Sequence, residues 1–175
     1  MTPRRRLLNL LVAAHAGERA AALAYRGHHR SLPAGADRDE IRIIEAEEWH
    51  HRARLALWLE RLGGKPWLPR EWTLAAIGGT LGPLCRISGW LAPMYGAGFL
   101  EAQNVNDYRV GADLARQLDL AELADELQQF AVVEDRHETF FRERVLSHPL
   151  GPWLPRWRAE AGRPSDAALV GDATG

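Results

Sequence analysis

The sequence predicts an all-α protein, a bundle of four long helices with a short apolar crossover segment before the third core helix. Two observations support this class. Apolar residues recur every three or four positions over several long stretches, which is the period of one helix face. Glycine and proline cluster between these stretches, and no convincing run alternates apolar and polar residues as a strand does.

The first two long helices are expected in the N-terminal third of the chain. The first spans about 5–25, because Gly27 is a typical residue after a helix C-terminus. The second begins at Asp37, which forms a capping-box pattern with Glu40, and ends before the glycine and proline residues of segment 63–66.

The segment 72–100 is apolar, and Arg86 is its only charged residue. Its length suits a membrane span, but repeated glycines and prolines divide it. We expect two helical pieces, about 73–90 and 94–118, with Pro93 at or near the break. Two explanations stay open for its apolar side chains: burial inside a bundle, which we favour, or insertion of one face into a membrane interface.

The last core helix opens with Asp119 and Glu122, which repeat the capping pattern, and runs to about residue 146 before several prolines prevent its continuation. This division predicts a helical bundle over 1–148. It also predicts a tail over 149–175 that contains Pro and Trp and is partly disordered, from about Arg163 onward.

Composition excludes some kinds of function. With 22 Lys and Arg against 23 Asp and Glu, the net charge of -1 argues against nucleic-acid binding. Cys85 is the single cysteine, which excludes an internal disulfide framework and a cysteine-based metal site. A metal ion must therefore be held by histidines and carboxylates.

The apolar stripes of the long helices carry such residues. The second and fourth helices each place a Glu and a His three positions apart on the stripe, and the first and third each place one Glu there. An isolated buried charge is costly, so these positions need an explanation. The six residues are Glu18, Glu48, His51, Glu101, Glu134 and His137.

This set is the ligand inventory of di-iron carboxylate bundles, in which carboxylates and imidazoles hold two ions and leave positions open for dioxygen. Random placement would give about 0.6 Glu-x-x-His pairs, against three in this chain. The third pair, Glu47 and His50, is displaced by one residue and is expected to face solvent. A metal-free bundle, with its carboxylates neutralised by arginines, is the alternative.

The remaining candidates are weaker. We expect His15 to lie off the core stripe, and His28, His29 and His148 to be solvated at helix ends or in loops. Tyr108 is a candidate catalytic residue, since it lies near the metal-facing stripe; Tyr25 does too, and for both we favour ordinary core packing.

At this point the residues resemble a known family, the demethoxyubiquinone hydroxylases of the ferritin-like superfamily. The segment His15-Ala16-Gly17-Glu18, followed by Tyr25-Arg26-Gly27, is similar to that family's first-helix motif. The two Glu-x-x-His motifs, the glycine-rich crossover and Glu101 with Tyr108 continue the resemblance in order over about residues 8–141.

The resemblance implies a ligand assignment and a reaction. Glu18, Glu48 and His51 would hold one iron, and Glu101, Glu134 and His137 the other, with Glu48 and Glu134 bridging. The family hydroxylates a polyprenylated benzoquinone in ubiquinone biosynthesis, using dioxygen and an external reductant, at the membrane surface. We therefore expect a monooxygenase that is cytoplasmic or peripheral on the inner face of the cell membrane, as a monomer or small homo-oligomer.

Two other functions stay open. A ferritin-like or rubrerythrin-like protein would oxidise iron or remove peroxide without an organic substrate. A helical interaction module would bind a partner through the apolar crossover and hold no metal. The ligand set does not separate iron from manganese, because both metals accept these donors.

Overall fold

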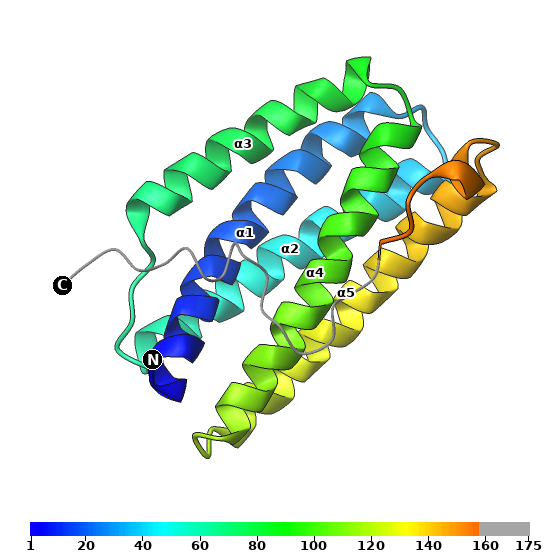
Figure 1. Ribbon diagram of the computed structural model, residues 1–175. Helices are drawn as coiled ribbons and strands as arrows, with labels where there is room; N and C mark the ends of the chain where they lie inside the picture. Colours follow the sequence, from blue (N-terminus) through cyan, green and yellow to red (C-terminus); the bar gives the residue numbers. More distant parts are fainter. Residues whose placement is uncertain (158–175) are drawn as a thin grey trace. The chain divides into compact units, whose positions relative to one another are not determined.

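The computed structural model describes residues 1–157, and every regular element in that range is helical (Figure 1). The all-α class is thus confirmed, whereas the predicted disorder in the tail from Arg163 onward lies outside the described residues. The elements are α1 (Pro3–Ser31), α2 (Ala36–Arg61), α3 (Leu68–Ile87), α4 (Leu91–Arg116), α5 (Ala121–Ser147) and the short 3-10 helix η1 (Gly151–Trp153).

The chain divides into two compact units, described here separately. The α1–α3 unit comprises Leu11–Pro93, and the α4–α5 unit comprises Met1–Leu10 together with the chain from Met94 onward. Each unit contains one of the two Glu-x-x-His motifs that the sequence analysis singled out.

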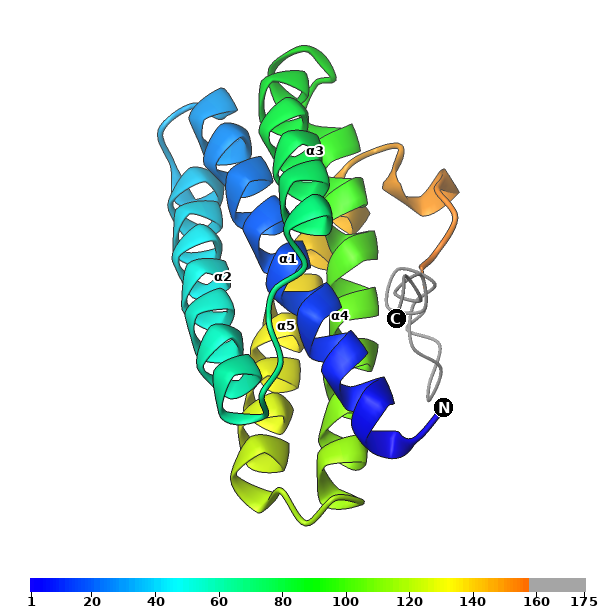
Figure 2. The same cartoon turned by 90° about the vertical axis from the view of Figure 1, so that its left-hand side faces the viewer.

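Within the α1–α3 unit, α3 packs closely along α1 through small residues (Figure 2). A Cβ atom on Gly78 would clash with the backbone of Ala20, and one on Gly27 would clash with the backbone of Gly82. The prediction that α1 ends near Gly27 is therefore wrong. Gly27 lies inside α1. A glycine is required there because the close approach of α3 leaves no room for a side chain.

Most apolar side chains of α3 are exposed. Its buried positions form a narrow stripe that consists of Glu71, Ala75, Gly78 and Gly82. In contrast, Trp72 is 66% exposed and Ile87 is 81% exposed. The favoured expectation of burial for the segment 72–100 thus does not hold for its α3 part, because a stripe of small residues packs against α1 and the large residues face outward.

The breaks between helices also differ from the expectation. The helix stops at Ile87, Gly89 adopts a φ of 77°, and α4 begins at Leu91. Pro93 consequently lies near the break, as expected, in the first turn of α4, where a missing N–H costs nothing. Gly35, and not Asp37, occupies the position before α2.

Within the α4–α5 unit, the two helices are joined by a tight turn in which Asp119 has a φ of 56°. Asp119 is therefore a turn residue, and Leu120 takes the position before α5 that the capping pattern had assigned to Asp119. The rings of Tyr108 on α4 and Phe130 on α5 pack edge to face, with centroids 5.4 Å apart.

The start of the predicted tail returns onto the α4–α5 unit. The Tyr95 hydroxyl donates a hydrogen bond to the carbonyl of Pro155, and the Trp157 indole donates one to the Glu138 carboxylate at 2.8 Å. None of the helices in residues 1–157 combines the length and apolar composition that crossing a membrane requires.

Candidate metal centre

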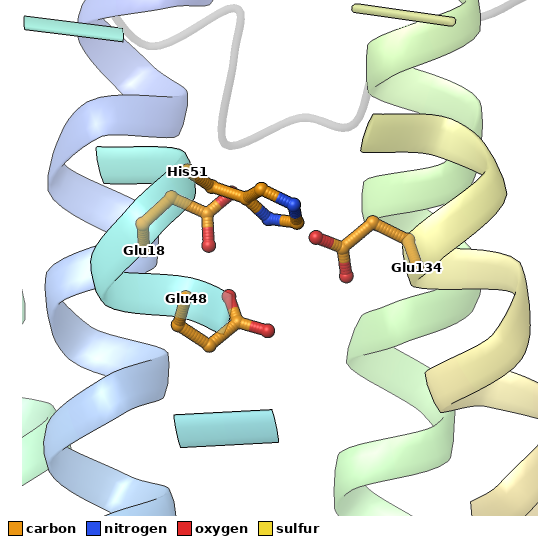
Figure 3. A group of neighbouring side chains, drawn as sticks. All are labelled: Glu18, Glu48, His51 and Glu134. Carbon is orange, nitrogen blue, oxygen red and sulfur yellow. The ribbon is translucent and has the colours of Figure 1, made fainter. Parts of the chain in front are cut away.

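In the α1–α3 unit three predicted ligands come together. Glu18 lies on α1, Glu48 and His51 lie on α2, and no side chain of the three is more than 3% exposed. Each offers one ligand atom, and these atoms lie within 4.8 Å of one another. Figure 3 shows Glu18 reaching from one helix and Glu48 and His51 from the other. We call this group the α1–α2 triplet.

In the α4–α5 unit the other three predicted ligands come together. Glu101 lies on α4, Glu134 and His137 lie on α5, and all three are at most 1% exposed. One ligand atom from each again lies within 4.8 Å of the others. The amide of Asn104 donates a hydrogen bond to Glu101 at 3.3 Å. We call this group the α4–α5 triplet.

Local sequence explains why these side chains point inward. On α2, Ile41, Ile44, Leu55 and Leu59 are fully buried, and Glu48 and His51 continue the same stripe at intervals of three and four residues. The same holds on α5, where Leu123, Leu127 and Phe141 bury the face that carries Glu134 and His137. The hydrophobic effect thus brings the ligands into the interior with their aliphatic neighbours.

The donor set fits divalent iron or manganese. Carboxylate oxygens and imidazole nitrogens are the ligands that these metals accept, and no thiolate is present among them. Each triplet supplies two carboxylates and one imidazole, so the two triplets have the same composition. The four carboxylates carry a charge equal and opposite to that of two divalent ions.

The other predicted site residue, Tyr108, is buried in α4 and packs against Phe130. It lies seven residues, or two helical turns, beyond Glu101 on the same helix. This placement agrees with the favoured interpretation of Tyr108 as a core residue. Tyr25 is similarly buried, at 5% exposure.

A buried carboxylate that the sequence analysis missed lies on α3. Glu71 is 3% exposed and lies 2.6 Å from Nδ1 of His15 and 2.8 Å from Arg52. Burial alone would raise the pKa of Glu71, but hydrogen bonds from Arg52 and His15 outweigh it and lower the pKa. Burial and the nearby Arg52 lower the pKa of His15.

The sequence did contain a signal for Glu71. It is the only acidic residue in the segment 61–100, and it lies two positions after a proline that begins a helix. The expectation that His15 lies off the core stripe is wrong. His15 is 4% exposed because its partner comes from the crossover helix, which a pattern on α1 alone does not reveal.

A second cluster surrounds Glu45 on α2. Its carboxylate accepts hydrogen bonds from Arg26 at 2.7 Å and from Trp49 at 3.3 Å, and lies 3.0 Å from the ring of His29. Burial would raise the pKa of Glu45, but these hydrogen bonds lower it. His29 is thus buried, at 8% exposure, and His28 is 2% exposed. The prediction that both are solvated is wrong because α1 continues past Gly27.

A small open pocket lies between α4 and α5. Its volume is about 160 Å³, and Ala102 and Asp135 in its wall directly follow Glu101 and Glu134 in the chain. The remaining lining residues are Val105, Arg109, Glu138 and Trp157.

Comparison with known proteins adds no assignment. No family model, no curated protein and no solved structure matches this chain significantly. The two buried triplets and the chemistry of their donors are therefore the features that indicate function.

Proposed function

We propose that the two triplets together form a di-iron carboxylate centre in a ferritin-like bundle. Glu18, Glu48 and His51 hold one ion in this proposal, and Glu101, Glu134 and His137 hold the other. Each ion would be held by one Glu-x-x-His motif, that of Glu48 or that of Glu134, together with the single Glu of the paired helix. The observation that carries the proposal is the burial of four carboxylates and two imidazoles, each at most 3% exposed.

The proposed reaction is hydroxylation of a lipophilic substrate, with a polyprenylated benzoquinone as the first candidate. One oxygen atom of dioxygen enters a C–H bond of the substrate, and the other leaves as water with two protons and two electrons from an external reductant. Ferrous ions, when bound, supply the open positions and the electrons that dioxygen activation requires.

The protein's own residues provide binding and exclusion of water. The carboxylates neutralise the charge of the ions, and the two histidines complete the donor set from helix positions fixed by packing. Aliphatic neighbours such as Leu55 and Leu127 are fully buried and keep this region dry. A dry apolar environment favours an apolar substrate over water.

Support for a lipophilic substrate comes from α3. Trp72, Leu84 and Ile87 expose large apolar side chains at 66%, 45% and 81%, and Arg86 is the only charged residue of α3 after Glu71. A helix of this kind suits the surface of a membrane, where a polyprenylated quinone resides. We therefore propose peripheral attachment to the inner face of the cell membrane.

Metal content is the first test. The purified chain is loaded anaerobically with ferrous iron, desalted and analysed, together with the double variant Glu48→Ala, His137→Ala. We expect about two irons per wild-type chain and loss of both in the variant. The matched control is Glu47→Ala, His50→Ala, which removes a Glu-x-x-His pair displaced by one residue and keeps both irons.

The other outcomes separate the alternatives. Many irons per chain would favour an iron-oxidising storage protein. No specifically bound metal in the wild type would exclude both di-iron functions and leave the interaction module. If two irons bind, incubation with isotopically labelled dioxygen, a reductant and a short-chain demethoxyquinone is expected to yield a product heavier by one labelled oxygen atom.

A further inference from the structure

Glu71 connects three helices through a buried charged cluster that the proposed function does not use. Its Oε1 accepts a hydrogen bond from Nδ1 of His15 on α1 at 2.6 Å. Its Oε2 lies 2.8 Å from Nη2 of Arg52 on α2 and 3.7 Å from Nη1 of Arg19 on α1. The carboxylate itself comes from the first turns of α3, so all three helices of the α1–α3 unit meet at this group.

Arg52 makes a second link in the same place. Its Nη1 donates a hydrogen bond to the backbone carbonyl of His15 at 2.7 Å. One guanidinium therefore holds the backbone of α1 and the carboxylate of α3 at the same time. The planar fork of arginine permits this double contact, which the single ammonium of lysine does not reproduce.

The cluster is adjacent to the α1–α2 triplet along both helices. His15 lies three residues before Glu18, and Arg52 lies four residues after Glu48 and directly after His51. Residues three or four apart share one side of a helix and are separated by one turn, about 5.4 Å. These contacts on α1 and α2 thus lie one turn from Glu18 and from Glu48, and Arg52 directly follows His51.

We propose that Glu71 is a positioning residue for the α1–α2 triplet. By holding His15 and Arg52 it fixes the rotation of α1 and of α2 about their own axes at the level of the ligands. Glu18, Glu48 and His51 then converge before a metal ion arrives, so the ion does not have to order them. This inference rests on the proposed metal centre and deepens it.

A purely structural role for Glu71 predicts a different relation between metal affinity and folding stability. If Glu71 only attached α3 to the other helices, metal affinity would fall in proportion to folding stability, whatever substitution weakened the attachment. A positioning role predicts loss of affinity for one metal ion beyond the loss of stability, because outer residues that orient ligands typically change metal affinity by about 10-fold to 100-fold.

Titration with Co²⁺ under anaerobic conditions measures this difference, since its visible spectrum reports the number of ions bound and their coordination. For Glu71→Gln we expect one of the two ions to bind about 10-fold to 100-fold more weakly, and the other with wild-type affinity. The matched control is Gly82→Ala, because its Cβ would press at 3.0 Å on Gly27 and loosen α3 three turns away from Glu71. We expect it to bind both ions as the wild type does.

A second pair of variants covers the case in which Glu71→Gln does not fold. His15→Asn retains an N–H near the position of Nδ1 and is expected to bind Co²⁺ within about threefold of the wild type. His15→Ala removes this donor and is expected to weaken one ion at least 10-fold. Thermal unfolding of the metal-free variants supplies the stability scale for the comparison.

The outcomes are distinct. Wild-type Co²⁺ affinity in Glu71→Gln, or equal loss in Gly82→Ala at equal loss of stability, would overturn the positioning role and leave the metal centre intact. Equal weakening by His15→Asn and His15→Ala would overturn it as well. A wild-type chain that binds no Co²⁺ would overturn the proposed centre itself, and the positioning role with it.

Discussion

Three candidate metal ligands of this protein are carboxylates at positions where a carboxylate is unfavourable. Glu48, Glu101 and Glu134 are 0% exposed, on helix faces otherwise made of leucine, isoleucine and phenylalanine. Burying a charged group costs several kcal/mol unless ions or hydrogen bonds compensate it. Glu71 and Glu45 show such compensation from arginine and histidine. Glu134 lies 3.5 Å from His137, and in our proposal a metal ion adds compensation for the candidate ligand carboxylates.

A stability measurement on Glu134→Gln tests this cost. Without metal, the substitution removes one of two buried carboxyl groups, those of Glu101 and Glu134, whose oxygens lie within 4.8 Å of each other, so we expect the free energy of unfolding to rise by about 1–3 kcal/mol. Urea unfolding in the presence of a chelator measures it. Glu47→Gln, at a half-buried position, serves as the control and is expected to change stability by at most about 0.5 kcal/mol. A lower stability of Glu134→Gln in chelator would favour the metal-free alternative.

His28 predicts a pH dependence of stability. Burial and the neighbouring His29 lower its pKa to about 4 in the folded chain, against the opposing charge of Asp37. The unfolded chain takes up the proton below about pH 6.5 and the folded chain only below about pH 4, so stability falls as the pH falls through this window. At pH 5.5 the loss attributable to His28 is about 1.4 kcal/mol.

The measurement compares unfolding free energies of the wild type and His28→Gln at pH 7.5 and pH 5.5. Glutamine does not titrate, so the variant is expected to lose about 1.4 kcal/mol less than the wild type between the two pH values. Other titrating groups, Glu45 and Glu71 among them, contribute equally to both chains. Parallel losses in the two proteins would contradict the assignment.

At the level of elements, α3 is attached by its smallest residues. Ala75, Gly78 and Gly82 allow close approach to α1. Near the start of α3, Glu71 adds its contacts with His15 and Arg52. A larger side chain in this contact must displace backbone, because no flexible side chain can move aside.

Substitution of two adjacent glycines separates packing from helix propensity. Gly78→Ala places a Cβ against the Ala20 backbone, and we expect a loss of about 1–3 kcal/mol in the free energy of unfolding. Gly79→Ala meets nothing within 4 Å and gains helix propensity, so we expect it to stabilise by up to about 1 kcal/mol. Urea unfolding of both variants measures the difference, and equal effects would show that α3 does not pack on α1 as described.

At the level of the whole chain, the helical class and the inward stripes that carry the six candidate ligands were predictable from the sequence. Apolar residues recur at intervals of three and four around Glu48 and Glu134, and this spacing directly indicates the buried face of each helix. Contacts made by residues far apart in the sequence were not predictable. The partner of His15 lies 56 residues away, and Gly27 was mistaken for a helix end because its neighbour Gly82 comes from another helix.

Metal binding is expected to stabilise the whole chain against unfolding, because the unfolded chain does not assemble the ligands. With free ferrous iron at 1,000 times the dissociation constant, each ion contributes about 4 kcal/mol. Anaerobic thermal unfolding with and without iron measures the shift. Glu48→Ala, His137→Ala is expected to show none, whereas Glu47→Ala, His50→Ala keeps the wild-type shift. A shift that persists in the first variant would place the ions elsewhere.

The absence of a side chain at Gly98 has an optical consequence. The ring of Trp157 lies against Gly98, where a Cβ atom would come within 3 Å of it, and Gly98 precedes Glu101 by one turn of α4. The same indole is hydrogen-bonded to Glu138, one turn after Glu134. Paramagnetic ions held by Glu101 and Glu134, as proposed, would quench the emission of this indole at short range, and Trp157 would then be an intrinsic fluorescent reporter of loading at the α4–α5 triplet.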